Sequence, residues 1–378
     1  MRVLIFSTAY YPFVGGAEVA IKEITNRIGD IQFDMITARL DSKLPVFERI
    51  GNVNVYRVGF GFKHFDKWWL MKFGGWKAIA LHRKNHYDVT WSMMASWGGL
   101  AAWWFSIICP KVPLVVTLQE GDEIDARKFG LVSLGWRLIL SRAKVVTVIS
   151  NYLREEARRY GYKGEVILVP NGVDIEKFKR QNSKGKNTSQ NLREKLGFLE
   201  KDIVLITTSR LVEKNGVGDI IEALRFLPEN VKLLVAGVGE LEQDFKFKIS
   251  NLKLENRVKM LGFVDQKNLP KYLHASDIFV RPSLSEGMGI SFLEAMATGL
   301  PIIATKVGGI PDFLTHERTG LFCEVKNPKS IAEQVKRLMT DRELKDRIIA
   351  GAKATVSTYD WKYILGKMEN TLKSSIGR

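Results

Sequence analysis

Short apolar runs alternate with amphipathic stretches along the whole chain, and this alternation predicts an α/β protein. In the first half, a polar loop and a helical pattern follow most of the apolar runs, so we expect the strands to lie parallel in a doubly wound sheet. The expected strands are residues 3–7, 33–37, 53–58, 87–90, 114–118, 145–149 and 166–169.

A second series of the same kind begins at residue 203, after a polar stretch at 179–190 that reads as an exposed connection. Its expected strands are residues 203–208, 231–236, 258–261, 277–280, 302–304 and 320–322. The apolar residues after Asp360 share one helical face, so this last segment must pack on something. A chain of 378 residues is expected to form two domains. The predicted parts are a first domain at 1–175, a linker region at 176–200, a second domain at 201–357 and a C-terminal helix at 358–378.

The composition, with 46% hydrophobic and 26% charged residues, is that of an ordinary soluble globular protein, but the formal charge of +16 is high. This charge predicts attraction to an anionic partner, such as a nucleotide-sugar, an acidic lipid or a nucleic acid. Cys109 and Cys323, the two cysteines, lie far apart and lack metal-site spacing. We therefore expect a reducing, cytoplasmic location, and the first apolar run is too short for a signal peptide.

Two segments bear on membranes. Residues 89–110 carry no charge, yet Ser92, Ser96 and a glycine pair interrupt them, which favours a strand, a loop and a buried helix over a membrane-spanning helix. In residues 61–77, lysines alternate with six aromatic residues. This segment is either a peripheral contact with an anionic membrane or a core-packing helix with solvated lysines. No recognised nucleic-acid-binding module surrounds it.

The stretch from Glu286 to Glu294 carries the strongest chemical signal. A strand leads into a loop with two glycines, and a helix is expected from about Ile290 until Gly299-Leu-Pro301 ends it. The N–H groups of Gly289, Ile290 and Ser291 and the positive end of the helix dipole suit a phosphate. Two carboxylates would then flank one anion-binding pocket, although an ordinary helix start with an acidic first turn would have the same sequence.

Three further places carry candidate chemistry. Arg210 and Lys214 follow a strand end together, where they could grip a diphosphate, although each taken singly reads as a surface charge. Gly15-Gly16 precedes a helix without the dinucleotide fingerprint, so a simple tight turn explains it equally well. A loop at 119–125 places four acidic residues after a strand's carboxyl end, the edge at which such sheets bind ligands.

These residues together resemble the retaining glycosyltransferases of the GT-B fold, family 4, over nearly the whole chain. The matching pieces, in order, are Gly15-Gly-Ala-Glu18, Pro170-Asn-Gly-Val-Asp174, Ser209-Arg-Leu-Val-Glu-Lys214, Val235-Ala-Gly-Val-Gly-Glu240, the glutamates at 286 and 294, and Gly308-Gly-Ile-Pro311. The resemblance implies two facing Rossmann-like domains. The second holds a nucleoside-diphosphate sugar, the first binds the acceptor, and the final helix crosses back to the first.

The resemblance also implies a role for each matching residue. Glu286 would contact sugar hydroxyls near the anomeric carbon, and Glu294 would accept hydrogen bonds from ribose hydroxyls. Cationic Arg210 and Lys214 would neutralise the diphosphate. The backbone amides of Gly289, Ile290 and Ser291, together with that of Gly16, would hold its phosphates. Many relatives carry a histidine near the donor sugar where this chain has Gln119, and Gln119 cannot take a proton. Either the sugar contact differs, or Glu120 and Asp122 share that role.

The expected reaction is retaining transfer of a hexosyl group to a glycolipid, lipid-linked or polysaccharide-precursor hydroxyl. We expect no cofactor and no metal, because the cations can stabilise the leaving group and no Asp-x-Asp triplet occurs. Use of the two glutamates as in a glycoside hydrolase is not favoured, since Glu294 suits the ribose better. A sugar-nucleotide epimerase of the same fold is the alternative. A non-enzymatic basic binding module is a third reading, and a dehydrogenase is the least consistent with the loops. Sugar, nucleotide, acceptor and oligomeric state stay open.

Overall fold

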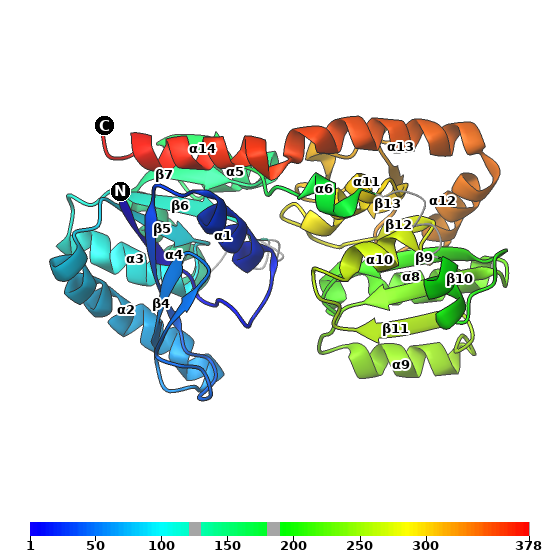
Figure 1. Ribbon diagram of the computed structural model, residues 1–378, viewed down its shortest axis with the longest axis horizontal. Helices are drawn as coiled ribbons and strands as arrows, with labels where there is room; N and C mark the ends of the chain where they lie inside the picture. Colours follow the sequence, from blue (N-terminus) through cyan, green and yellow to red (C-terminus); the bar gives the residue numbers. More distant parts are fainter. Residues whose placement is uncertain (121–129, 180–189, 378) are drawn as a thin grey trace. The chain divides into compact units, whose positions relative to one another are not determined.

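The computed structural model describes residues 1–120, 130–179 and 190–377. It divides into two compact units, one formed by residues 1–171 with 361–378 and the other by residues 172–360. Each unit contains its own mainly parallel sheet covered by helices, which can be followed by colour along the chain (Figure 1).

The first unit is built on a sheet in the order β3-β4-β2-β1-β5-β6-β7-β8. The strands are β1 (Arg2–Phe6), β2 (Gln32–Ala38), β3 (Phe47–Ile50), β4 (Val53–Val58), β5 (Val89–Met93), β6 (Leu114–Leu118), β7 (Ala143–Val148) and β8 (Glu165–Leu168). The helices are α1 (Gly16–Arg27), α2 (Lys63–Asn85), α3 (Trp97–Ile108), α4 (Leu131–Arg142), α5 (Asn151–Arg159) and α14 (Trp361–Ser374). Alternate strand residues face α1 and α14 on one side of the sheet, while α2, α3 and α4 pack in a row that covers the other.

The sheet of the first unit differs from the predicted one at its edge. Seven parallel strands were expected, but β3 adds an eighth, which pairs antiparallel with β4. Its sequence, Phe-Glu-Arg-Ile, is short and its side chains are exposed or half-buried, so the apolar pattern that marks a buried strand is absent. This strand forms because it pairs with β4, and that pairing is visible only in the folded sheet.

Residues 89–110 form β5, a loop and α3, as the sequence predicts. One face of α3, including Ala101, Ala102 and Phe105, is buried, while Ile107 and Ile108 are exposed. Among the described residues, no helix combines the length and the apolar character needed to cross a bilayer.

The C-terminal helix α14 packs within the first unit against α1 and the sheet. Its residues Trp361, Ile364, Met368 and Leu372 are buried in the same core as β1 and β2, and Lys373 Nζ lies 2.7 Å from Asp30 Oδ2. The apolar face seen in the sequence therefore completes one side of this core.

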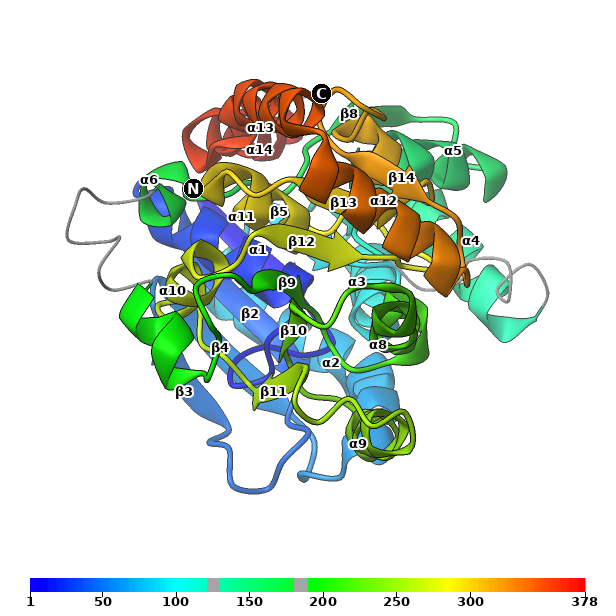
Figure 2. The ribbon, with the colours of Figure 1, turned by 90° about the vertical axis from the view of Figure 1, so that its right-hand side faces the viewer.

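The second unit is built on a sheet in the order β11-β10-β9-β12-β13-β14. The strands are β9 (Ile203–Thr208), β10 (Val231–Ala236), β11 (Val258–Gly262), β12 (Ile278–Arg281), β13 (Ile302–Thr305) and β14 (Leu321–Cys323). The longer helices are α8 (Val217–Ala223), α9 (Glu242–Asn251), α10 (Leu269–His274), α11 (Ile290–Thr298), α12 (Pro328–Thr340) and α13 (Arg342–Val356), and a single turn, α6, spans Ile175–Phe178. Figure 2 shows α8, α9 and α12 on one side of this sheet and α10 and α11 on the other.

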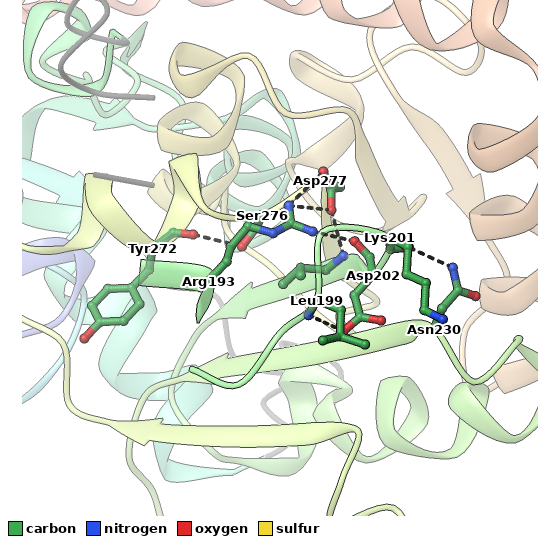
Figure 3. Close-up of polar contacts among 9 residues, drawn as sticks. Arg193, Leu199, Lys201, Asp202, Asn230, Tyr272, Ser276 and Asp277 are labelled. Atoms are coloured by element: carbon green, nitrogen blue, oxygen red, sulfur yellow. Dashed lines mark hydrogen bonds and ion pairs between the residues drawn. The ribbon is translucent and has the colours of Figure 1, made fainter. Parts of the chain in front are cut away.

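Polar contacts fasten the amino ends of the strands in the second unit (Figure 3). Arg193 NH1 lies 3.2 Å from Asp277 Oδ2, which also accepts the Val204 N–H at 2.8 Å. Nearby, Asn230 Nδ2 donates to the Lys201 carbonyl at 3.0 Å. These contacts fix where β9, β10 and β12 begin, so the carboxyl ends of β9 and β12, which carry the candidate site, are held at the opposite edge.

Candidate active site

The candidate site lies in the second unit, where β12 leads through a loop into α11. Gly289 caps the helix with φ of +85°, a conformation that glycine adopts without strain, and α11 begins at Ile290. A Cβ at Gly289 would stand 2.6 Å from the Phe292 ring. Glu286 and Glu294 are 8% and 5% exposed, so both carboxylates that bracket the helix start are buried. The predicted strand, loop and helix are therefore present.

A third buried ionic side chain, Arg281 at the end of β12, joins the parts of this loop. Its NH2 donates to Glu286 Oε2 at 2.5 Å and to Asn215 Oδ1 at 3.0 Å, and its NH1 donates to Ser291 Oγ at 2.8 Å. The guanidinium also lies 5.4 Å from the Phe292 ring centroid. Arg281 is not among the site residues predicted from the sequence, although a cation at the end of an apolar strand, directly before a glycine-containing loop, is a signal that the sequence does carry.

The loop after β9 carries the two candidate phosphate-binding cations and meets the loop after β12 through backbone contacts. The N–H of Leu284 donates to the Lys214 carbonyl at 2.7 Å, and Asn215 Nδ2 donates to the Arg210 carbonyl at 2.7 Å. Arg210 is exposed and Lys214 is half-buried. Since Asn215 also contacts Arg281, the structure links both cations to the Glu286 loop.

The backbone of Glu286 explains the first glycine of the pair after β13, Gly308. Its φ is +53°, and a Cβ at this position would lie 1.8 Å from the Glu286 carbonyl oxygen. The next residue, Gly309, donates its N–H to that same oxygen at 3.0 Å. Only glycine lets the chain pass this close, so the Gly-Gly-Ile-Pro motif supports the backbone of Glu286 from behind.

Glu294 sits in α11 at the end of a short polar chain. Gln266 Nε2 donates to Glu294 Oε1 at 3.1 Å, and Lys177 Nζ, from α6, donates to Gln266 Oε1 at 3.2 Å. Burial raises the pKa of the Glu294 carboxyl above its ordinary value, while Gln266, Lys177 and Arg281 act in the opposite direction. Sequence reasoning did not identify Gln266, which lies in an exposed loop without a motif.

The raised pKa of Glu294 predicts a gain in stability when its charge is removed. The folded state holds the proton of Glu294 more tightly than the unfolded state. The contribution of this group to stability is therefore fully present below the unfolded-state pKa, and it is lost as the pH rises through the raised pKa. We expect Glu294→Gln to raise the Tm at neutral pH, by about 2–4 °C per kcal/mol, and the gain to vanish in acid. Thermal unfolding between neutral and acidic pH measures this difference.

Glu317→Gln is the matched control, because an ion pair with Arg337 lowers the pKa of Glu317. Its stabilising effect is present above the unfolded-state pKa, so its removal should leave the Tm unchanged or lower it. A Glu294→Gln protein less stable than wild type at neutral pH would contradict the assignment of a costly buried carboxylate, which is typical of residues kept for a ligand.

The candidates in the first unit lie at the carboxyl edge of its own sheet. Gly15 is the N-cap of α1, and Gly16, its first residue, is exposed. Gln119 follows β6, and its Nε2 donates to Asn171 Oδ1 at 3.0 Å. Glu120 is 2% exposed and accepts the backbone N–H groups of Ala95 and Gln119 at 2.6 and 2.9 Å. The carboxylate of Glu120 therefore fixes the backbone locally, and Asp122, the other acid predicted there, lies outside the described residues.

Within the described ranges, no group of three or more His, Cys, Asp or Glu side chains is arranged as a metal site. What the site of the second unit offers is a helix start with buried carboxylates on either side and cations on the neighbouring loop.

Comparison with known proteins identifies the class of this chain. A family model described as "Glycosyl transferases group 1" matches residues 188–355, and one described as "Glycosyltransferase Family 4" matches residues 14–177. An uncharacterized glycosyltransferase of Methanocaldococcus jannaschii is 30% identical over 99% of this chain and 98% of its own length. The chain therefore belongs to the group 1, family 4 glycosyltransferases, and it is an enzyme of the glycosyl-transferring class.

Two further relatives and one structure illustrate this kinship. The N-acetyl-alpha-D-glucosaminyl L-malate synthase of Bacillus anthracis is 29% identical over 93% of this chain and 91% of its own. The UDP-Gal:alpha-D-GlcNAc-diphosphoundecaprenol alpha-1,3-galactosyltransferase of Escherichia coli is 29% identical over 70% of this chain and 69% of its own. A crystal structure of Anabaena HepE with UDP and glucose, 24% identical, covers 99% of this chain and 100% of its own with a TM-score of 0.81. The fold is GT-B, as the sequence predicts.

Proposed function

We propose that the protein is a retaining hexosyltransferase that moves a hexosyl group from a nucleoside-diphosphate sugar to a lipid-linked, glycolipid or polysaccharide-precursor hydroxyl. The observation that carries this proposal is the pair of buried carboxylates, Glu286 and Glu294, on either side of the α11 N-terminus. One carboxylate suits sugar hydroxyls, the other suits ribose hydroxyls, and the N–H groups between them suit the diphosphate.

In the proposed reaction, the bond between the anomeric carbon and the phosphate oxygen breaks while the acceptor oxygen bonds to the same face of that carbon. The acceptor proton passes to the departing phosphate, so no covalent enzyme intermediate forms. Arg210, Lys214 and the amides of Gly289, Ile290 and Ser291 stabilise the charge that develops on the leaving group. These cations supply what a divalent metal would, and we propose that the enzyme works without one.

The donor and the acceptor class rest on relatives. The Escherichia coli enzyme is named for a UDP-sugar and a diphosphoundecaprenol acceptor, whereas the Bacillus anthracis enzyme is named for L-malate, a small soluble acceptor. A surface of the first unit favours the lipid-linked class for this chain.

That surface, which we call the aromatic face, comprises the loop before α2 and the outer side of α2. It carries Phe60, Phe62, Phe65, Trp68 and Trp76, which are 52%, 68%, 45%, 41% and 57% exposed. Exposed aromatic rings of this number on one helix and its loop mark an interaction surface rather than scattered surface residues. The core-packing reading of this helix is true of its inner side only, where Leu70 and Ala78 are buried.

The charge of the aromatic face suits an anionic membrane. Lys72 lies 5.2 Å from the Trp68 ring and Lys77 lies 5.2 Å from the Tyr56 ring, so cations stand among the aromatic residues. The one acid in α2, Asp66, is 0% exposed. Its carboxylate accepts the N–H groups of Phe60, Gly61 and Phe62 at 2.8, 2.6 and 2.9 Å, which holds the aromatic loop in place. We propose a peripheral, cytoplasmic contact with the membrane through this face, without nucleic acid.

Replacing Phe62, Phe65 and Trp68 together by Ser should lower partitioning onto vesicles of phosphatidylglycerol and phosphatidylcholine by at least about tenfold, or about 1.4 kcal/mol. Vesicle sedimentation measures this, and binding should weaken on vesicles without the anionic lipid and in high salt. Ser replacements at Phe247 and Phe263, which are 69% and 66% exposed in the second unit, are the matched control and should bind as wild type. Equal binding of both variants would count against the membrane contact.

The reaction itself is tested by incubating the protein with UDP-, GDP- and ADP-sugars in EDTA, with and without an extract of lipid acceptors, and following nucleoside diphosphate release. One donor should be consumed, and faster with acceptor. Conversion of a donor to another nucleotide-sugar without acceptor would instead identify the epimerase. Absence of release from every donor would overturn the proposal.

A further inference from the structure

Arg281 is a buried cation that has no role in the proposed reaction as described above. It ends β12, and it is 9% exposed. Burying a guanidinium is costly unless its donors are matched by acceptors. The acceptors of its hydrogen bonds therefore indicate the role of the Arg281 side chain.

The planar guanidinium contacts three elements at once. NH2 donates to Glu286 Oε2 in the β12–α11 loop at 2.5 Å and to Asn215 Oδ1 in the turn after β9 at 3.0 Å. NH1 donates to Ser291 Oγ in the first turn of α11 at 2.8 Å. Its Nε finds no partner among the described residues. The side chain therefore adopts an orientation that joins the loop, the turn and the helix start, although this orientation leaves one of its buried donors without a hydrogen bond.

We infer that Arg281 is a positioning residue for the donor site. It fixes the Glu286 carboxylate in one orientation and sets it against the turn that carries Arg210 and Lys214. This inference rests on the proposed function, since the sugar contact of Glu286 is part of it. The sugar-binding and phosphate-binding parts of the site are thereby held as one preorganised unit.

A lysine cannot replace this residue. Its single Nζ is a point donor, whereas the guanidinium fork reaches Glu286 and Ser291 with separate nitrogens. Arg281→Lys keeps the charge and loses the geometry, while Arg281→Gln loses both. The pair separates the effect of charge from that of orientation.

Arg257 provides the matched control in the same unit. It is also buried, at 5% exposure, and its donors contact the carbonyls of Val231, Leu227 and Pro228 near the start of β10, away from the candidate site. Arg257→Gln should lower the Tm while leaving the kcat of the folded enzyme within threefold of wild type.

The experiment measures kcat, and nucleoside diphosphate affinity by calorimetry, with whichever of UDP-glucose, UDP-galactose, GDP-mannose or ADP-glucose the wild-type protein consumes. Arg281→Gln should lower kcat at least thirtyfold, and Arg281→Lys at least fivefold, with the dissociation constant for the nucleoside diphosphate alone changed less than fivefold. In a Glu286→Gln background, adding Arg281→Gln should lower kcat by no more than a further threefold, because Arg281 acts through Glu286.

Three results would overturn the inference while wild-type turnover upholds the proposed function. They are a kcat within threefold of wild type in Arg281→Gln, full multiplication of the two losses in the double variant, and a loss of the same size in Arg257→Gln. If Arg281→Gln does not fold, Arg281→Lys decides by the same criteria. Failure of the wild-type protein to consume any donor would instead refute the proposed function.

Discussion

Glu286→Gln should lower the rate of nucleoside diphosphate release by about 100- to 1000-fold while the protein stays folded. The carboxylate is the acceptor of the 2.5 Å bond from Arg281 and is buried. Removing one partner of a buried ion pair costs about 3–5 kcal/mol of folding stability, because it leaves an uncompensated charge, so the variant should also unfold at a lower temperature. Here that charge, Arg281, would lie beside the donor sugar, and the sugar hydroxyls would lose their strongest acceptor.

Steady-state kinetics with the consumed donor, together with thermal unfolding, tests this expectation. Glu156→Gln is the control, because Glu156 is 1% exposed and pairs with Arg159 in the first unit, outside the proposed site. It should reduce stability and leave the rate of the folded enzyme unchanged. A Glu286→Gln enzyme with a near-normal rate would remove Glu286 from the mechanism.

Lys214→Met should lower kcat by about 100-fold, the second largest effect. The reaction must place negative charge on the departing diphosphate, and loss of one preorganised donor to such a charge costs about 10²–10³ in kcat. Lys214 is held near the Glu286 loop by the bond between its carbonyl and the Leu284 N–H. Arg210, which is exposed, should contribute less.

The measurement is single-turnover donor consumption with and without added Mg²⁺, because the rate in excess enzyme reports the chemical step. Lys232→Met, a half-buried lysine of β10, is the control and should react as wild type. Full restoration of the Lys214→Met rate by Mg²⁺, or a single-turnover rate equal to that of wild type once the enzyme is saturating, would contradict the role of Lys214 in leaving-group stabilisation.

Much of the fold could be read from the sequence, because buried strands and amphipathic helices carry their own periodicity. The run 203–208 and the helix start at Ile290 are examples, and both lie where they were expected. Strand β3 could not be read, since its short exposed sequence is extended only by pairing with β4. Residues 121–129 and 180–189 lie outside the described residues, and they include most of the predicted acidic loop at 119–125 and of the exposed connection at 179–190.

The candidate site divides along the same line. Glu286, Glu294 and the helix start belong to one local stretch, so their order alone indicates a pocket. Gln266 contacts Glu294 from another loop, and Arg281 contacts Asn215 in the turn that follows the neighbouring strand β9. Such contacts depend on the order of the strands in the sheet, which cannot be deduced from a single sequence. The roles carried over by family resemblance, including those of Gly16 and Gln119, stay predictions until a donor is bound.

Proton NMR of the consumed donor with lipid acceptors in EDTA reports both the anomeric configuration of the product and the need for metal, because the anomeric signals can be followed over time. A retaining enzyme that needs no metal should give loss of the α-anomeric signal of the donor and growth of an α-linked product at an undiminished rate. A β-linked product, or transfer that starts only when a divalent metal is added, would contradict the proposed reaction.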